Sequence, residues 1–165
     1  MPRARDALPW LGLALRLASG AVWLVAGVTK LPDLSGFPAL VERYQLLPHI
    51  LAQPFGYLLP FLEIGLGLYL AAGLFVRGSA LVGTVLFAVF LTAQVQAWLR
   101  GLPLDCGCFG TISRSTVGPA TIARDILLGI PTFLMLAFPA RTLSLDRRLF
   151  GAPDSFSAGD PSPQT

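Results

Sequence analysis

Four apolar segments of membrane-spanning length constrain this chain more than any other feature. They cover residues 10–28, 55–76, 79–99 and 117–138, and as helices each is long enough to cross a hydrocarbon core about 30 Å thick. The composition agrees, because 54% of the residues are hydrophobic and only 13% are charged, which is too apolar for an ordinary soluble domain. The sequence therefore predicts an all-α polytopic membrane protein, a bundle of four transmembrane helices.

Residues 30–54, between the first two segments, are too polar to span a membrane. Apolar side chains nevertheless recur there at helical spacing, which predicts a short helix; they are Phe37, Leu40, Val41, Tyr44 and Leu47. This helix fits an interfacial position with Tyr44 at headgroup depth. It fits equally well a helix that packs on the end of the bundle.

The chain divides into a leader, a membrane domain and a tail. We expect a basic leader at residues 1–9, the membrane domain at 10–140, and a tail at 141–165 whose Gly, Pro, Ser and Asp content favours disorder. A cleaved signal peptide is excluded because Arg16 interrupts the first apolar run, which then continues to Val28. Arg16 is predicted to snorkel toward the headgroups. Gly20 and Gly27 share one helix face, where they would let a neighbouring helix approach closely.

The basic residues indicate topology rather than nucleic-acid binding. The formal charge is only +3, and the Lys and Arg residues are scattered at segment ends with no basic face. Six lie on the side of the termini: Arg3, Arg5, Arg77, Arg141, Arg147 and Arg148. Four lie on the other side: Lys30, Arg43, Arg100 and Arg114. The positive-inside rule thus predicts a plasma-membrane protein with cytoplasmic termini and an extracytoplasmic loop at residues 100–116.

That loop contains the chain's two cysteines, Cys106 and Cys108, separated by Gly107. A disulfide between them needs α-carbons roughly 4.4–6.8 Å apart, a tight turn that Gly107 permits. Strained or exposed disulfides are the ones that exchange with other thiols, and the outer compartment lets them form. The pair could instead be buried hydrophobes, a structural staple or soft-metal ligands. No metal is predicted, because the single histidine, His49, is distant in sequence.

Three polar residues inside the spans are expected to form a layer below this loop. Counted along the helices, Glu63 lies about 12 Å and Arg124 about 10 Å from the outer ends of their spans, with Gln94 at a similar depth. A buried charge needs a partner, so a Glu63–Arg124 ion pair is predicted. The layer would either lock the bundle or handle protons. In the loop, Arg100 and Arg114 would favour a thiolate, whereas Asp105 would oppose it.

Several short motifs occur together in one order. They are Arg16-Leu17, Gly27-Val28-Thr29-Lys30-Leu31-Pro32-Asp33, Tyr44-Gln45-Leu46-Leu47-Pro48, Pro60-Phe61-Leu62-Glu63-Ile64-Gly65-Leu66-Gly67, Cys106-Gly107-Cys108-Phe109-Gly110 and Arg124. Over residues 10–140 the chain resembles the methylamine-utilisation MauE family, within the wider DoxX-like membrane proteins. It departs from the family at Asp125, where an asparagine is usual.

The resemblance implies a four-helix membrane bundle that matures the disulfide-rich small subunit of methylamine dehydrogenase with a thioredoxin-like extracytoplasmic partner. It also implies that Cys106 and Cys108 are the exchanging pair and that Glu63, Arg124 and Lys30 are recurring polar positions. From the residues themselves we expect Phe109 to anchor the loop.

The predicted function is thiol-disulfide exchange with an extracytoplasmic client, in contact with membrane lipid. Two other classes stay open: a non-enzymatic membrane scaffold, and a binder of small lipophilic ligands that uses the polar layer. The sequence shows no cofactor-binding motif, and it does not exclude a quinone as cofactor.

Overall fold

The computed structural model of the chain describes residues 4–108 and 115–137. Helices make up its regular structure: α1 (Ala4–Val28), the 3-10 helix η1 (Leu31–Asp33), α2 (Gly36–Arg43), α3 (His49–Ala72), α4 (Val76–Leu99) and α5 (Pro119–Ala137). The four long helices α1, α3, α4 and α5 are long and apolar enough to cross a membrane. The predicted all-α, four-span fold is confirmed, and the chain is a multi-pass membrane protein.

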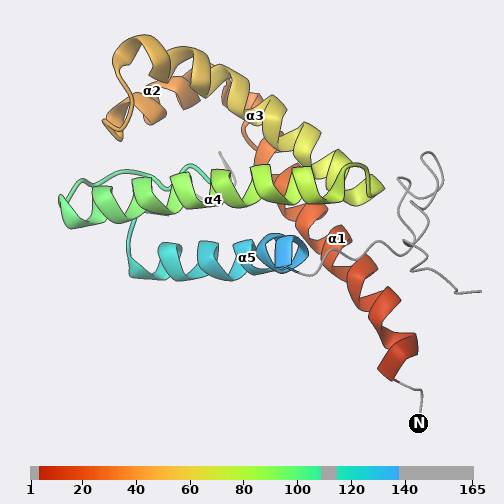
Figure 1. The fold of residues 1–165 in the computed structure, drawn as a ribbon. Coiled ribbons are helices and arrows are strands. Elements are labelled where there is room, and N and C mark those ends of the chain that lie inside the picture. Colours follow the sequence, from red (N-terminus) through yellow and green to blue (C-terminus); the bar gives the residue numbers. More distant parts are fainter. Residues whose placement is uncertain (1–3, 109–114, 138–165) are drawn as a thin grey trace, which may run out of the picture.

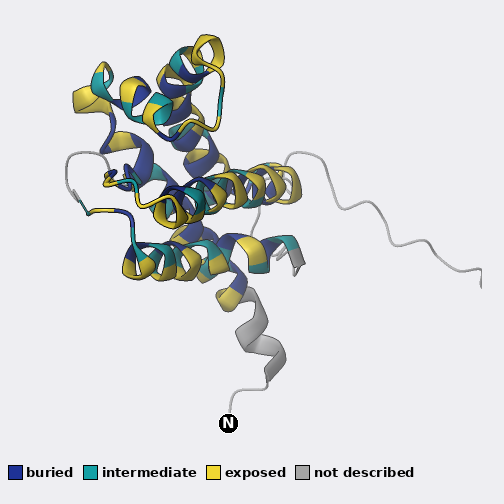
Figure 2. Cartoon of the chain, turned by 90° about the vertical axis from the view of Figure 1, so that its left-hand side faces the viewer, coloured by how far each residue is buried: buried dark blue, intermediate teal, exposed yellow. Residues whose placement is uncertain are grey.

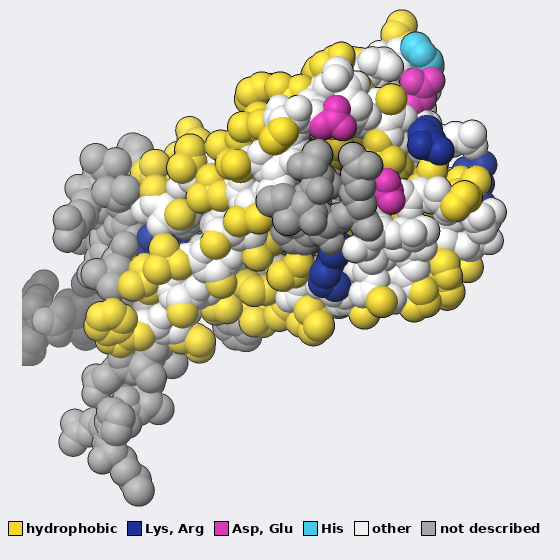
Figure 3. Space-filling view, turned by 180° about the vertical axis from the view of Figure 1, so that it is seen from behind, with side chains coloured by type: hydrophobic (Ala, Val, Ile, Leu, Met, Phe, Trp, Pro, Cys, Tyr) yellow, Lys and Arg dark blue, Asp and Glu magenta, His cyan; other side chains and the backbone are white. Residues whose placement is uncertain are grey.

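The most extensive contact of the bundle is between α1 and α3. α3 also contacts α2 and α4, and α5 packs against both α4 and α1 (Figure 1). Many large hydrophobic side chains of the long helices are exposed, and exposed residues run along α4 and α5 in Figure 2. Seen from behind, the surface is mostly hydrophobic and its charged side chains gather mainly toward one end (Figure 3). An apolar flank of this kind is the surface that contacts lipid acyl chains.

Glycines bring α1 and α3 into close contact. A Cβ added to Gly20 would lie 2.9 Å from the Ala71 Cβ, and one added to Gly27 would lie 2.7 Å from the Pro60 carbonyl oxygen. Because neither position has room for a side chain, the two backbones approach as small-residue membrane interfaces do. The predicted role of Gly20 and Gly27 is confirmed, and α3 is the neighbouring helix.

Arg16 does not snorkel, so this prediction is wrong. The residue is 3% exposed, and its guanidinium donates to the carbonyl oxygens of Leu70 (3.4 Å) and Ala71 (3.0 Å). These carbonyls belong to the last turn of α3, where unpaired acceptors and the negative end of the helix dipole stabilise a cation. Gly73, in the left-handed conformation at φ 72°, ends the helix against the same guanidinium.

The ends of the spans differ from the predicted ones. The second span begins earlier than residue 55, at His49, and ends at Ala72 rather than at residue 76. The turn into α4 is therefore at residues 73–75, not at Arg77 and Gly78. Gly73 and Phe75 both adopt positive φ angles there, a backbone turn that hydropathy alone does not reveal.

The predicted short helix between the first two spans is confirmed as α2. Phe37 and Tyr44 are 7% and 9% exposed, and the helix packs on α3. Tyr44 is thus buried against neighbouring parts of the chain. The packing of α2 fits a helix that covers one end of the bundle, and that place is also compatible with an interfacial helix.

Candidate functional site

Backbone hydrogen bonds hold the two arms of the cysteine loop to each other. Cys106 N–H donates to the Ser115 carbonyl (2.9 Å), and Val117 N–H donates to the Leu104 carbonyl (2.8 Å). These bonds flank an isolated antiparallel bridge between Asp105 and Thr116. The two arms of the loop therefore run side by side, and the cysteines are held at a defined place over the helices.

Gly107 is required by both conformation and space. Its φ is +68°, in the left-handed region that favours glycine. A Cβ there would also lie 2.6 Å from the Leu40 side chain of α2. The predicted tight glycine turn is present, and it lets both sulfurs turn toward the same point.

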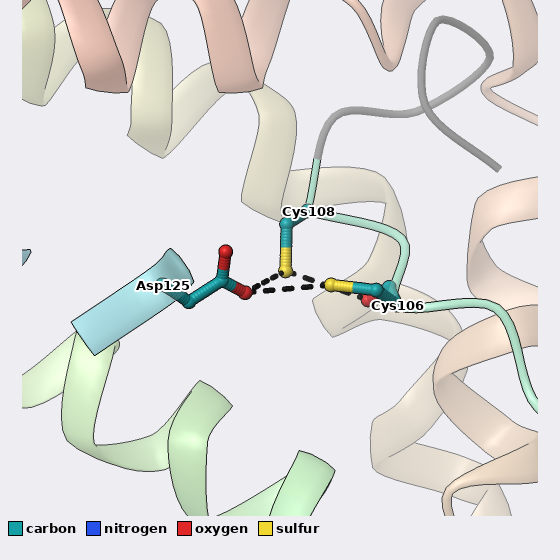
Figure 4. A group of neighbouring side chains, drawn as sticks. All are labelled: Cys106, Cys108 and Asp125. Atoms are coloured by element: carbon teal, nitrogen blue, oxygen red, sulfur yellow. Dashed lines mark hydrogen bonds between the residues drawn. The ribbon is translucent and has the colours of Figure 1, made fainter. Parts of the chain in front are cut away.

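That point is the carboxylate of Asp125 on α5 (Figure 4). The Cys108 thiol donates to Asp125 Oδ2 at 2.9 Å, and the Cys106 thiol lies 3.4 Å from the same oxygen. Both cysteines are free thiols in this structure. Cys106 is only 6% exposed and Cys108 is half-buried, so the pair is not freely exposed. The loop folds back and inserts its sulfurs between the helices.

Two N–H donors face the sulfurs from neighbouring helices. Arg124 Nη2 lies 3.4 Å from Cys106 Sγ, and Arg124 Nε donates to Asp125 Oδ1 at 2.9 Å. On α4, Gln94 Nε2 donates to Asp125 Oδ2 at 2.7 Å and lies 3.4 Å from Cys108 Sγ. A sulfur that accepts hydrogen bonds is stabilised as a thiolate, so this arrangement suits thiol chemistry.

The two thiols are electrostatically unequal. The hydrogen bond from the Cys108 thiol lowers the pKa of Cys106 below that of an ordinary thiol. The same bond, together with burial, raises the pKa of Cys108. Cys106 is therefore the sulfur that ionises first and the better leaving group in exchange.

Lys30 lies beside the pair and is 1% exposed. Its ammonium contacts both Glu63 oxygens (2.8 and 2.7 Å) and also donates to the Cys108 carbonyl (2.9 Å). The predicted Glu63–Arg124 ion pair is wrong: among the described residues Glu63 pairs with Lys30, and Arg124 pairs with Asp125. Lys30, placed outside the spans by hydropathy, is thus the link between the polar layer and the cysteine loop.

Tyr44 fixes the loop from the side of α2. Its hydroxyl donates to the carbonyl oxygens of Asp105 (2.9 Å) and Cys106 (3.3 Å). Burial raises the pKa of Tyr44 above that of a free phenol, so the hydroxyl stays a donor at physiological pH. The sequence motif contained Tyr44, but only the fold shows that it contacts the loop.

The remaining predicted loop residues contribute less to the described site. Arg100 donates to Gln45 Oε1 at 2.5 Å on the exposed side, so it does not face the thiols as expected. Phe109, Gly110 and Arg114 lie outside the described residues, and the predicted anchoring by Phe109 stays a prediction. The cation beside the thiols is Arg124 instead.

The residue that sequence reasoning missed is Asp125. It was noted only as a departure from the usual asparagine, although a carboxylate in an apolar segment was itself a signal. It is 4% exposed and joins both cysteines, Gln94 and Arg124 in one network.

The same group has the composition of a soft-metal site. The sulfurs of Cys106 and Cys108 and an oxygen of Asp125 lie within 4.8 Å of one another, and two thiolates with a carboxylate would suit Zn²⁺. Each sulfur accepts one N–H contact, Cys106 from Arg124 and Cys108 from Gln94, and these contacts stabilise a thiolate whether it exchanges or coordinates.

Comparison with known proteins agrees with this architecture. The family model described as Methylamine utilisation protein MauE matches residues 8–138. The Methylamine utilization protein MauE of Methylophilus methylotrophus is 31% identical over 133 residues, covering 79% of this chain and 70% of the relative. The protein of the same name from Paracoccus denitrificans is 27% identical, covering 80% of this chain and 74% of the relative. The one from Paracoccus versutus is 29% identical, covering 83% of this chain and 77% of the relative. No solved structure matches the chain. The family match spans all four membrane helices and the cysteine loop between the last two, and the chain therefore belongs to the MauE family.

Proposed function

We propose that this membrane protein carries out thiol-disulfide exchange with an extracytoplasmic client through Cys106 and Cys108. One observation carries the proposal: both sulfurs converge on the Asp125 carboxylate, beside the Arg124 guanidinium. A structural staple or buried hydrophobes would need no charged groups aimed at the sulfur atoms. Paired thiols with unequal pKa values and a proton acceptor are what stepwise exchange requires.

The site geometry supports a particular order of steps. Starting from the Cys106–Cys108 disulfide, a client thiolate attacks the more accessible Cys108 sulfur. The disulfide bond breaks, Cys106 leaves as a thiolate beside Arg124, and the client is joined to Cys108. A second client thiolate then attacks the client sulfur of this mixed disulfide, releasing Cys108, which takes up a proton with Asp125 as its neighbour. Two electrons pass from the client to the pair, and the reverse sequence reduces a client.

The setting of the reaction is part of the proposal. The distribution of basic residues supports cytoplasmic termini and an outward cysteine loop, which a thioredoxin-like protein could reach. The relatives are named for methylamine utilisation, and we extend that role to this chain. The client would be a protein of that process whose disulfides must be formed or rearranged.

Trapping tests the exchange directly. In Cys106→Ser, Cys108 can still join a client disulfide but position 106 cannot resolve the product, so a mixed disulfide should accumulate. Cys108→Ser should trap much less, because the remaining sulfur is buried. Captured species would be detected on non-reducing gels and identified after reduction, with the double Ser variant as control.

The alternatives give different outcomes. A scaffold would support client maturation equally well with either Ser variant and capture nothing. A lipophilic-ligand binder would lose function when Glu63 is replaced and keep it when the cysteines are replaced. Capture by Cys106→Ser that is absent from the double variant supports exchange; equal, negligible capture by all variants contradicts it.

A further inference from the structure

The two thiols and the carboxylate that converge at the cysteine loop are spaced closely enough to hold one metal ion. One ligand atom from each of Cys106, Cys108 and Asp125 lies within 4.8 Å of the other two. Asp125 Oδ2 is 2.9 Å from Cys108 Sγ and 3.4 Å from Cys106 Sγ. Around a tetrahedral Zn²⁺ ion, sulfur and oxygen ligands lie roughly 3.5–3.8 Å apart. A small outward shift of Cys108, which is half-buried, therefore completes the geometry.

The space beside these residues suits a small ligand. A cavity of about 30 Å³ has Cys108 and Asp125 in its wall, together with Glu63 and Trp23. This volume is enough for roughly one or two water molecules. Zinc sites with three protein ligands keep their fourth position for a water molecule. The cavity therefore has room for the one ligand that the three side chains do not supply.

The charges around the site also match a divalent cation. With both cysteines ionised, the two thiolates and the Asp125 carboxylate carry three negative charges. Arg124, which contacts Cys106 Sγ at 3.4 Å and Asp125 Oδ1 at 2.9 Å, supplies one positive charge. Glu63 adds nothing to this sum, because it is paired with Lys30. Two negative charges remain, and a buried excess charge is costly unless a counter-ion compensates it. The reduced pair can therefore hold either two protons or one divalent cation.

We propose that the reduced pair binds one Zn²⁺ ion through Cys106 Sγ, Cys108 Sγ and a carboxylate oxygen of Asp125. Two S–H bonds break, two S–Zn bonds form, the two protons leave to solvent, and no electrons move. The carboxylate ligand favours Zn²⁺ over Cu(I), which prefers soft sulfur ligands alone.

Zinc binding does not depend on the exchange proposed above, because it needs only the reduced thiols. It does limit that exchange. Sulfurs joined in a disulfide offer no thiolate to a metal, and a thiolate bound to zinc is not free to attack a disulfide. The Zn²⁺-bound state and the disulfide state therefore exclude each other, so that zinc holds the pair reduced.

The experiment titrates the full-length protein in detergent, reduced and freed of metal and reductant, with Co²⁺ in the absence of oxygen. Co²⁺ replaces Zn²⁺ in tetrahedral sites and reports bound thiolates by sulfur-to-cobalt charge-transfer absorption. This absorption should saturate at one ion per chain and disappear when Zn²⁺ is added. The double variant Cys106→Ser with Cys108→Ser should show none of it. Asp125→Asn should weaken Zn²⁺ binding about tenfold or more, corresponding to about 1.4 kcal/mol.

The matched control is His49→Ala, which removes the single histidine of the chain. This residue is exposed and could bind metal at the surface, so the variant should titrate as the parent protein does. Co²⁺ binding without charge-transfer absorption, or binding that persists in the double Ser variant, would show an adventitious ion only and overturn the site. Parent-like affinity in Asp125→Asn would overturn the three-ligand assignment.

A second measurement uses only the parent protein and covers the case in which a variant fails to fold. Saturating Zn²⁺ should slow alkylation of both cysteines about tenfold or more, and a chelator should restore the rate. Mg²⁺, which prefers oxygen ligands, should give no protection. Oxidation of the pair by a small-molecule disulfide should slow by a similar factor. Thiols that react equally fast with and without Zn²⁺ would overturn the zinc site and leave the proposed function standing.

Discussion

Two buried cations, Arg16 and Lys30, differ in the groups that stabilise their charge. Arg16 and Lys30 lie at the two ends of the α1 contact with α3, and they are 3% and 1% exposed. Arg16 is held by backbone carbonyls at the end of α3. Lys30 is held by the Glu63 carboxylate and by a carbonyl of the cysteine loop.

The difference lies in what each cation connects. Arg16 closes a helix terminus, where orphan carbonyls and the helix dipole stabilise its charge. Lys30 needs a carboxylate, and its remaining donor capacity holds the peptide that carries Cys108. We therefore expect loss of Arg16 to affect stability alone, and loss of Lys30 to affect both stability and thiol reactivity.

The largest effect is expected from Lys30→Met. This change leaves Glu63 buried without its partner, which typically costs about 3–5 kcal/mol, and it also releases the Cys108 carbonyl. Thermal unfolding in detergent should shift strongly downward, and client capture in a Cys106→Ser background should fall. Adding Glu63→Gln should recover much of the unfolding temperature without restoring capture, because the loop contact stays lost. Full recovery of both would show that Lys30 serves only the ion pair.

Arg16→Met should have the next largest effect. The carbonyls of Leu70 and Ala71 lose a donor, at about 1–3 kcal/mol for an unsatisfied buried group. The unfolding temperature should drop, while the alkylation rates of Cys106 and Cys108 stay those of the parent protein. A change in thiol reactivity as large as that of Lys30→Met would contradict the prediction that Arg16 affects stability alone.

The sequence alone predicts the membrane spans, but it does not predict which charged residues pair with one another. Hydropathy located the four spans, and counting along the helices predicts one layer for Glu63, Gln94 and Arg124. Depth does not fix rotation about a helix axis, so the pairing was wrong. Lys30 was counted outside the spans, yet the close α1–α3 approach at Gly27 brings it beside Glu63.

Asp125 was missed for a related reason. Neighbouring helix residues point about 100° apart, so their adjacency in sequence gives no reason to place Arg124 and Asp125 in one site. The long arginine side chain reaches back to its neighbour and to Cys106. The fold of the loop, which depends on contacts with α2 and α5 distant in sequence, was not predictable from the spacing of its two cysteines.

Asp125→Asn tests how the negative charge beside the cysteines affects the pKa of the two thiols. The carboxylate's negative charge raises the pKa of both thiols, so its removal should lower both pKa values and move the alkylation profile toward lower pH. Iodoacetamide labelling across pH would measure the shift. Glu42→Gln, whose carboxylate contacts His49 instead, is the matched control and should leave the profile in place. A shift to higher pH would mean that Asp125 acts mainly by organising the N–H donors of Arg124 and Gln94.

The smallest effect is expected from Tyr44→Phe, which tests how firmly α2 holds the loop. The phenol donates to the carbonyls of Asp105 and Cys106, and its loss should cost about 1 kcal/mol. Since those bonds help keep Cys106 buried, its alkylation rate should rise about fivefold at constant pH, the factor that about 1 kcal/mol supplies. Tyr57→Phe, on the half-exposed side of α3, removes a hydroxyl without touching the loop and should change neither quantity. An unchanged rate for Tyr44→Phe would show that the strand-like bridge at Thr116 and the Lys30 contact alone fix the cysteines, and that α2 merely covers them.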